Sequence, residues 1–217
     1  ANVKEVARAI GTDNRIGSRF LDSGPGFGGS CFKKDILNLV YMLRYYNLEK
    51  EANYWEGVIN INSHQTERFS KKIIDSLVNY SNKTISIFGW AFKKDTNDSR
   101  ESAAIYVADL LLDEMAKIDV FDPKVLENQI FGDLNNLNTR RPEENKFLLT
   151  VKKSPYDACK DSHAIAVLTE WEEFKDYDWN KIYKSMKKPA FIFDGRNILD
   201  KNKLEDIGFI YKGIGKN

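Results

Sequence analysis

Apolar residues in the first 80 positions recur every three or four residues, the spacing of one face of an α-helix. The pattern predicts three helical stretches, over about residues 3–10, 36–62 and 69–77, with Gly11 ending the first. Helices of this length with little core of their own usually pack against another chain or domain. We therefore expect residues 1–80 to form a helical unit with such a partner.

From residue 84 the period of the pattern changes from 3.6 to two. Thr84–Phe88 is rich in β-branched residues and is followed by Gly89, which predicts a strand that ends there. Further strands fit residues 118–121, 147–151, 163–168, 190–193 and 209–212, with a helix over 101–115 and a polar loop over about 132–146. Alternating strands and helices predict an α/β fold in which residues 81–217 form a Rossmann-like, doubly wound parallel sheet.

Composition narrows the class of protein. The chain has 217 residues, 42% apolar and 30% charged, which is ordinary for a globular protein. The net charge of +1 argues against nucleic acid or an anionic membrane as the main partner, and no apolar run approaches the roughly 20 residues of a spanning helix. Two cysteines make no disulfide framework, which suits a cytoplasmic protein. The chain opens without Met directly in a helical pattern, so we expect a piece of a longer protein.

A glycine-rich loop precedes Cys31, with four glycines in the six positions 24–29. Ser30 is a plausible helix N-cap, which would place Cys31 in the first helical turn. The partial positive charge of a helix start, with Lys33 and Lys34 nearby, lowers the pKa of a thiol and favours the nucleophilic thiolate. Asp35 follows one turn later on the same face. The alternative, a small core residue, is the commoner role of a lone cysteine and is our interpretation of Cys159.

The segment after the first strand has the order strand, loop, helix, strand and acid that is typical of a nucleotide-binding half-fold. Its loop lacks the Gly-x-Gly-x-x-Gly pattern, and bulky Trp90 and Phe92 would block close approach of a pyrophosphate. Charged residues nevertheless follow several predicted strands, at the edge where ligands of such sheets bind. They favour an anionic ligand, with surface charge as the alternative: Lys93, Arg100, Glu170 and Asp194-Gly195-Arg196.

Neither histidine has the spacing of a zinc site, and no Ser-His-Asp motif is present, so we expect no metal.

Four segments resemble the UDP-glucose 6-dehydrogenase family, closest to its eukaryotic form. Residues 26–35, GFGGSCFKKD, resemble its catalytic-cysteine segment, and residues 91–102, AFKKDTNDSRES, resemble the loop of its UDP-sugar-binding domain. The segments FDGR (193–196) and DNRIG (13–17) resemble two further blocks. The likeness runs from residue 1 to about 215.

The resemblance implies an NAD-dependent four-electron oxidation of UDP-glucose to UDP-glucuronate through a thiohemiacetal and a thioester on Cys31. It implies that Asp35 orients or deprotonates the hydrolytic water. Lys34 would lie near NAD, and Arg100 would reach the NAD phosphates.

The resemblance also assigns substrate contacts and an assembly. Arg15 would reach the UDP-sugar of a neighbouring subunit, so a homo-oligomer is implied: a dimer through the helical domain, with dimers assembling into a hexamer. Asp22 is a departure, because an animal enzyme carries a basic residue there. Besides Arg15, the resemblance implies that UDP-glucose is contacted by these residues: Asp22, Ser23, Gly24, Pro25, Gly26, Phe27, Gly28, Phe92, Lys93 and Arg196.

The family's amino-terminal NAD-binding domain is absent from these residues, so we expect the chain alone not to turn over. Two alternatives stay open. One is a related nucleotide-sugar 6-dehydrogenase acting on UDP-N-acetylglucosamine, UDP-N-acetylmannosamine or GDP-mannose. The other is a non-catalytic module for nucleotide-sugar binding or dimerisation, against which the intact Cys31 and Asp35 argue.

Overall fold

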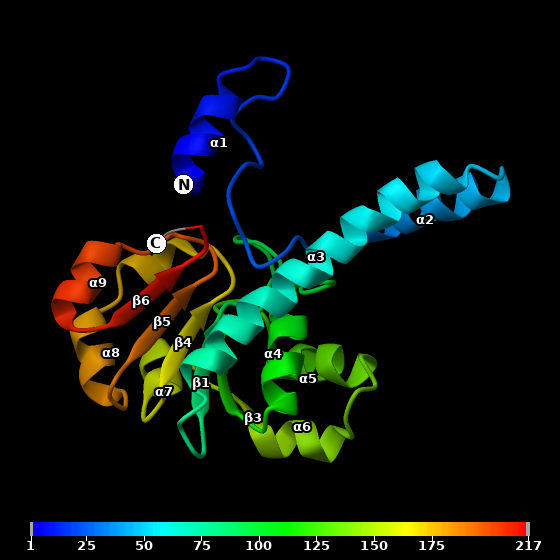
Figure 1. The fold of residues 1–217 in the computed structure, drawn as a ribbon. Coiled ribbons are helices and arrows are strands. Elements are labelled where there is room, and N and C mark those ends of the chain that lie inside the picture. The colour runs from blue at the N-terminus through cyan, green and yellow to red at the C-terminus, as the bar shows by residue number, and fades with distance from the viewer. Residues whose placement is uncertain (1, 216–217) are drawn as a thin grey trace.

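A six-stranded parallel sheet forms the body of the protein in the computed structural model, which describes residues 2–215 (Figure 1). The strand order is β3-β2-β1-β4-β5-β6, and every neighbouring pair is parallel. The predicted doubly wound sheet is therefore confirmed. The strands are β1 (Thr84–Phe88), β2 (Lys117–Phe121), β3 (Leu149–Val151), β4 (Ala164–Val167), β5 (Phe191–Asp194) and β6 (Ile210–Gly213).

Helices cover both faces of the sheet. The strand order reverses between β1 and β4, and because crossovers are right-handed the two halves place their helices on opposite faces. One face carries α4 (Ala103–Asp113), α5 (Glu127–Asn136) and α6 (Pro142–Leu148). The other carries α7 (Pro155–Cys159), α8 (Trp179–Ser185) and α9 (Lys201–Ile207), with the short 3-10 helix η1 (Glu172–Lys175) after β4.

The prediction of a polar loop over 132–146 is wrong, because α5 extends to Asn136 and α6 begins at Pro142. Leu134 is fully buried between polar neighbours. The buried Asn145 donates through Nδ2 to Asn135 Oδ1 at 2.9 Å, so polar residues pair across the two helices. Such partners compensate the desolvation that a polar sequence otherwise avoids, and the sequence pattern does not reveal them.

The helical part has α1 (Val3–Gly11), α2 (Phe32–Tyr45) and α3 (Glu49–Ser76). The stretch predicted over 36–62 is broken between α2 and α3, and the separate helix predicted over 69–77 is the end of α3, one continuous helix of 28 residues. α2 and α3 form an antiparallel hairpin that projects from the sheet (Figure 1) and has its own small core of Ile36, Val40 and Ala52. No helix described between residues 2 and 215 is long and apolar enough to cross a membrane.

The carboxyl-terminal part of α3 fastens this hairpin to the sheet. Phe69, Ile73 and Leu77 enter the main core beside α4. Two lysines connect α3 and β6, one from each element. Lys72 Nζ of α3 donates to the Gly213 carbonyl at 3.0 Å, and Lys212 Nζ of β6 donates to Ser76 Oγ at 2.7 Å. The position of the hairpin is therefore fixed by the sheet.

We predict that Ile73→Ala lowers the free energy of unfolding by about 2–5 kcal/mol, because Ile73 is fully buried and its truncation leaves a cavity. Urea unfolding followed by circular dichroism measures the change. Val78→Ala, at a side chain that is 67% exposed, is the matched control and should stay within about 0.5 kcal/mol. Equal effects at the two positions would contradict the packing described.

Candidate functional site

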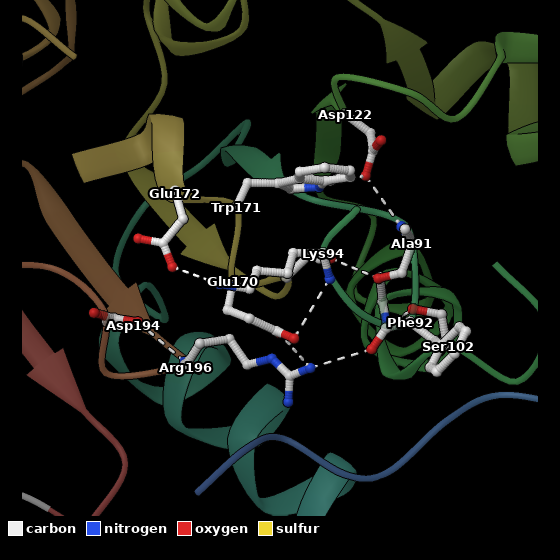
Figure 2. Close-up of polar contacts among 12 residues, drawn as sticks. Ala91, Phe92, Lys94, Ser102, Asp122, Glu170, Trp171, Glu172, Asp194 and Arg196 are labelled. Atoms are coloured by element: carbon white, nitrogen blue, oxygen red, sulfur yellow. Dashed lines mark hydrogen bonds and ion pairs between the residues drawn. The ribbon is translucent and has the colours of Figure 1, made fainter. Parts of the chain in front are cut away.

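The loop between β1 and α4 is held in place by the acid that follows β2 (Figure 2). One carboxylate oxygen of Asp122 accepts hydrogen bonds from the backbone N–H groups of Trp90 at 2.6 Å and Ala91 at 3.0 Å. The Trp90 ring is fully buried and donates through Nε1 to Asp133 Oδ2 at 2.9 Å. The N–H groups of Trp90 and Ala91 are therefore already hydrogen-bonded within the protein.

This arrangement does not fit NAD at the point where the strand order reverses. In a dinucleotide site the first loop offers its N–H groups to the pyrophosphate, and the acid after the second strand meets the ribose. Here the Trp90 and Ala91 amides and the Asp122 carboxylate bind one another. Gly89 is also tightly packed, since a Cβ there would lie 2.4 Å from the Thr169 side chain.

Arg196 lies at the carboxyl edge of the sheet, between the loops that follow β1 and β4 (Figure 2). Its Nη2 is 2.6 Å from Glu170 Oε2 and donates to the Phe92 carbonyl at 3.1 Å. The fully buried Asp194 accepts from the Arg196 N–H at 3.0 Å and from the Tyr211 hydroxyl at 2.9 Å. The predicted convergence of charges after the strands is thus confirmed for Arg196 and Glu170.

The glycine-rich loop lies along α3, whose polar side chains hold its backbone. Asn62 accepts from the Phe27 N–H at 2.8 Å and donates to the Phe27 carbonyl at 3.1 Å. Gln65 and Thr66 donate to the carbonyls of Gly24 at 3.3 Å and Pro25 at 2.8 Å. Sequence reasoning missed these three residues, although polar side chains at positions 62, 65 and 66 share one helical face.

The same loop packs closely against the sheet edge. A Cβ on Gly24 would lie 2.6 Å from Arg196 Nη1, and a Cβ on Gly28 would lie 2.4 Å from the Glu101 carbonyl. The Gly28 contact is with backbone, so the absence of a side chain there permits the approach, whereas at Gly24 the nearest atom is the movable end of the Arg196 side chain. Ser23 joins the edge as well, accepting from Asn197 Nδ2 at 2.7 Å.

Cys31 is exposed at the start of α2. The prediction of Ser30 as N-cap is wrong: the helix begins at Phe32, so Cys31 itself is the N-cap, without a capping side-chain hydrogen bond. The Cys31 carbonyl accepts from the Asp35 N–H at 2.8 Å, which is the first hydrogen bond of the helix. Ser30 therefore lies one residue before the N-cap. Asp35 is exposed one turn along, as its spacing predicts, and Lys34 is exposed beside it.

The predicted effect of Lys33 on the thiol is reduced, because its ammonium is paired elsewhere. Lys33 Nζ is 2.7 Å from Glu101 Oε2 and 3.1 Å from the Tyr106 hydroxyl. An opposite charge in contact cancels most of the field that a cation exerts on its other neighbours.

Arg100 brings the two loops together near Cys31. Its carbonyl accepts from the Gly29 N–H at 2.9 Å, and its guanidinium is held by Asp98 at 2.7 Å. The hydrogen bond and the charge of the Asp98 carboxylate raise the pKa of Arg100. Lys93 is exposed on the same loop, its Nζ 5.4 Å from the centre of the Phe92 ring.

Arg15 stands apart from this group, whereas Asp22 does not. The Arg15 side chain is 89% exposed and pairs with Asp13 at 2.7 Å. Asp22 is exposed and lines, with Ser23 and Arg196, a small cavity between α1 and the sheet edge. Arg15 therefore makes no contact with the remaining site residues within residues 2–215, and its role in a neighbouring subunit stays a prediction.

Other reactive groups have structural surroundings. Burial raises the pKa of the Cys159 thiol, which is fully buried. His163 accepts from the Thr84 N–H at 3.1 Å through Nδ1, and burial lowers its pKa. Among the described residues, no three His, Cys, Asp or Glu side chains are grouped to hold a metal ion.

Comparison with known proteins decides the family. Residues 86–201 match the UDP binding domain of the UDP-glucose/GDP-mannose dehydrogenase family, and residues 1–64 match its central domain. The chain belongs to the UDP-glucose/GDP-mannose dehydrogenase family. The first match ends beyond Arg196, and the second includes Cys31 and the glycine-rich loop.

Named relatives of this UDP-glucose/GDP-mannose dehydrogenase family member include UDP-glucose 6-dehydrogenases. The chicken protein is 51% identical over the whole chain and the Drosophila melanogaster protein 53% identical, and the chain spans 44% and 46% of them. A solved structure of a UDP-glucose dehydrogenase from the archaeon Pyrobaculum islandicum, 25% identical, matches with a TM-score of 0.76. That match covers 98% of this chain and 43% of the archaeal one.

We predict that iodoacetamide modifies one cysteine per folded chain, because Cys31 is exposed whereas Cys159 is buried and its thiol pKa is raised. Mass spectrometry of the intact chain measures the mass added. Unfolding in guanidinium should raise the count to two, and Cys31→Ser should reduce the native count to zero. Native modification of Cys159 would contradict the burial described.

Proposed function

We propose that the protein containing this chain oxidises the C6 alcohol of UDP-glucose to the carboxylate of UDP-glucuronate, with NAD as the oxidant. The observation that carries the proposal is that the glycine-rich loop, which lies against Arg196 at Gly24 and against Arg100 at Gly29, leads directly to an exposed cysteine. Membership of the family and relatives named UDP-glucose 6-dehydrogenase support the substrate.

Cys31 would act as the nucleophile. After the alcohol has lost a hydride and a proton, the Cys31 thiolate adds to the C6 aldehyde, and the resulting alkoxide takes up a proton to give a thiohemiacetal. Loss of a second hydride from C6, together with the proton of the thiohemiacetal hydroxyl, gives a thioester. Water then breaks the carbon–sulfur bond, which releases the carboxylate and returns the thiol. Asp35, exposed one turn from Cys31, would orient or deprotonate that water.

The sheet edge would bind the UDP-sugar. Arg196 is 18% exposed and would exchange part of its contact with Glu170 for the diphosphate, a geometry that guanidinium groups favour. Phe92 and Lys93 lie on the neighbouring loop and would complete this side of the pocket. Residues 22–28 would enclose the glucose and diphosphate from the other side, since their glycines allow close backbone approach.

NAD would supply the hydride acceptor for both oxidations when bound. Because the sheet's own switch point is filled by Trp90 and Asp122, this chain would contact NAD only from the rim of the site. The exposed Lys34, three residues after Cys31, and the exposed Arg100, whose carbonyl accepts from the Gly29 N–H, are the cations suited to its phosphates.

The α2–α3 hairpin would form a homo-oligomer contact. Large aromatic side chains on it are exposed, including Tyr41 at 70%, Tyr45 at 73% and Tyr54 at 72%. Aromatic groups in such numbers on one element are typical of protein–protein interfaces. A dimer through this hairpin would be the unit from which a hexamer assembles, and would let Arg15 reach the neighbouring subunit's site.

We predict that calorimetry of the chain with UDP-glucose shows binding that Arg196→Ala weakens at least about tenfold, the effect of losing a charge-assisted contact to phosphate. GDP-mannose, titrated into the same sample, should give no heat. Arg141→Ala is the control, since its side chain is 79% exposed and pairs with Glu144. Equal affinity for UDP-glucose in both variants would contradict the assignment of this edge.

A further inference from the structure

Three polar side chains meet between the start of α2 and the start of α4. Lys33 Nζ donates to Glu101 Oε2 at 2.7 Å and to the Tyr106 hydroxyl at 3.1 Å. The Tyr106 hydroxyl donates to the same carboxylate oxygen, which completes a closed set of contacts. We refer to Lys33, Glu101 and Tyr106 as the α2–α4 clamp.

The clamp joins the two segments that the proposed chemistry must align. Lys33 lies two residues after Cys31. Glu101 has a left-handed backbone, with φ 54°, and its carbonyl faces Gly28 so closely that no Cβ would fit. A second contact between the two segments involves a residue that precedes Cys31 in the sequence: the Gly29 N–H donates to the Arg100 carbonyl at 2.9 Å.

The strained backbone of Glu101 supports a specific role for this residue. A non-glycine residue with positive φ costs free energy and persists where surrounding contacts over-determine it. The contacts of Glu101 are its carboxylate with Lys33 and Tyr106 and its carbonyl against Gly28. Glu101 therefore contacts the cysteine segment in two ways: its carboxylate binds Lys33, and its carbonyl packs against Gly28.

The charges of the clamp persist at neutral pH. Partial burial alone would raise the pKa of Glu101, but hydrogen bonds from Lys33 and Tyr106 lower it on balance. Partial burial alone would lower the pKa of Lys33, but the same partners raise it on balance. The carboxylate and the ammonium therefore remain an ion pair in the range where a dehydrogenase works.

We propose that the α2–α4 clamp is a positioning device, which fixes the backbone of Cys31 against the β1–α4 loop so that its sulfur faces the C6 carbon of the bound sugar. Lys33, Glu101 and Tyr106 are positioning residues and touch no substrate. The proposal rests on the proposed function for what Cys31 attacks, whereas the fixing of its backbone is a property of the fold.

Hydrogen exchange of the chain, resolved to single amides, tests the fixing. We expect Lys33→Met and Glu101→Gln to speed exchange at the Gly29 and Asp35 amides roughly tenfold, the effect of losing a charge-assisted hydrogen bond. Amides in the core of β1 should be unaffected. Lys33→Arg keeps a donor and should restore protection. Glu114→Gln, at an exposed position after α4, is the matched control.

Exchange within about twofold of the original at Gly29 and Asp35 would overturn the proposal. So would equal acceleration throughout α2, α3 and β1, because the clamp would then be a general fastener of the hairpin to the sheet.

Steady-state kinetics of a full-length protein carrying this chain test the consequence. In Glu101→Gln we expect kcat for UDP-glucose oxidation to fall roughly tenfold while KM stays within about twofold, since the clamp aligns the nucleophile and does not bind the sugar. An unchanged kcat, with exchange accelerated, would overturn the positioning role. Activity retained in Cys31→Ser would instead refute the proposed function, and the exchange result would still decide whether the clamp fixes this segment.

Discussion

Two backbones that approach each other without intervening side chains are the constraint on which the site depends. The glycine-rich loop can lie on the β1–α4 loop because Gly28 has no Cβ to meet the Glu101 carbonyl, and the Gly29 N–H then reaches Arg100. Cys31 follows two residues after Gly29 and is the N-cap of α2. Any side chain at Gly28 would move the cysteine away from the groups that would bind its substrate.

The second constraint lies at the loop after β1, where the strand order reverses. Dinucleotide-binding folds of this topology leave that loop free to bind a ligand, whereas here side chains of the protein fill it. Asp122 binds the loop amides, and Trp90 occupies the core beneath them. Under the proposed function, the strand order that binds dinucleotides elsewhere would here recognise its ligand by side chains at the rim, through Arg196 and its neighbours. Fold topology places the ligand edge, whereas the loop contents decide which ligand fits.

The sequence predicted the sheet because strands of continuous apolar residues alternate with helices, a pattern that little else produces. It failed for residues 132–146, where the pairing of Asn135 with Asn145 lets polar helices form. The place of Cys31 at the start of a helix, the close backbone approach of the glycines and the place of Arg196 at the sheet edge could be predicted, whereas the roles assigned to them stay predictions. The partners of Lys33 and Asp122 could not be predicted, because Glu101 and Trp90 reach them only through the tertiary fold.

Protection of Cys31 by the substrate tests most directly whether the thiol and the sheet edge form one site. With UDP-glucose at saturation, we predict that alkylation of Cys31 by iodoacetamide slows at least about tenfold, since the bound sugar would cover the sulfur. GDP-mannose at the same concentration should leave the rate unchanged. Calorimetric binding of UDP-glucose with no change in the alkylation rate would contradict a shared site and leave Cys31 without the role assigned to it.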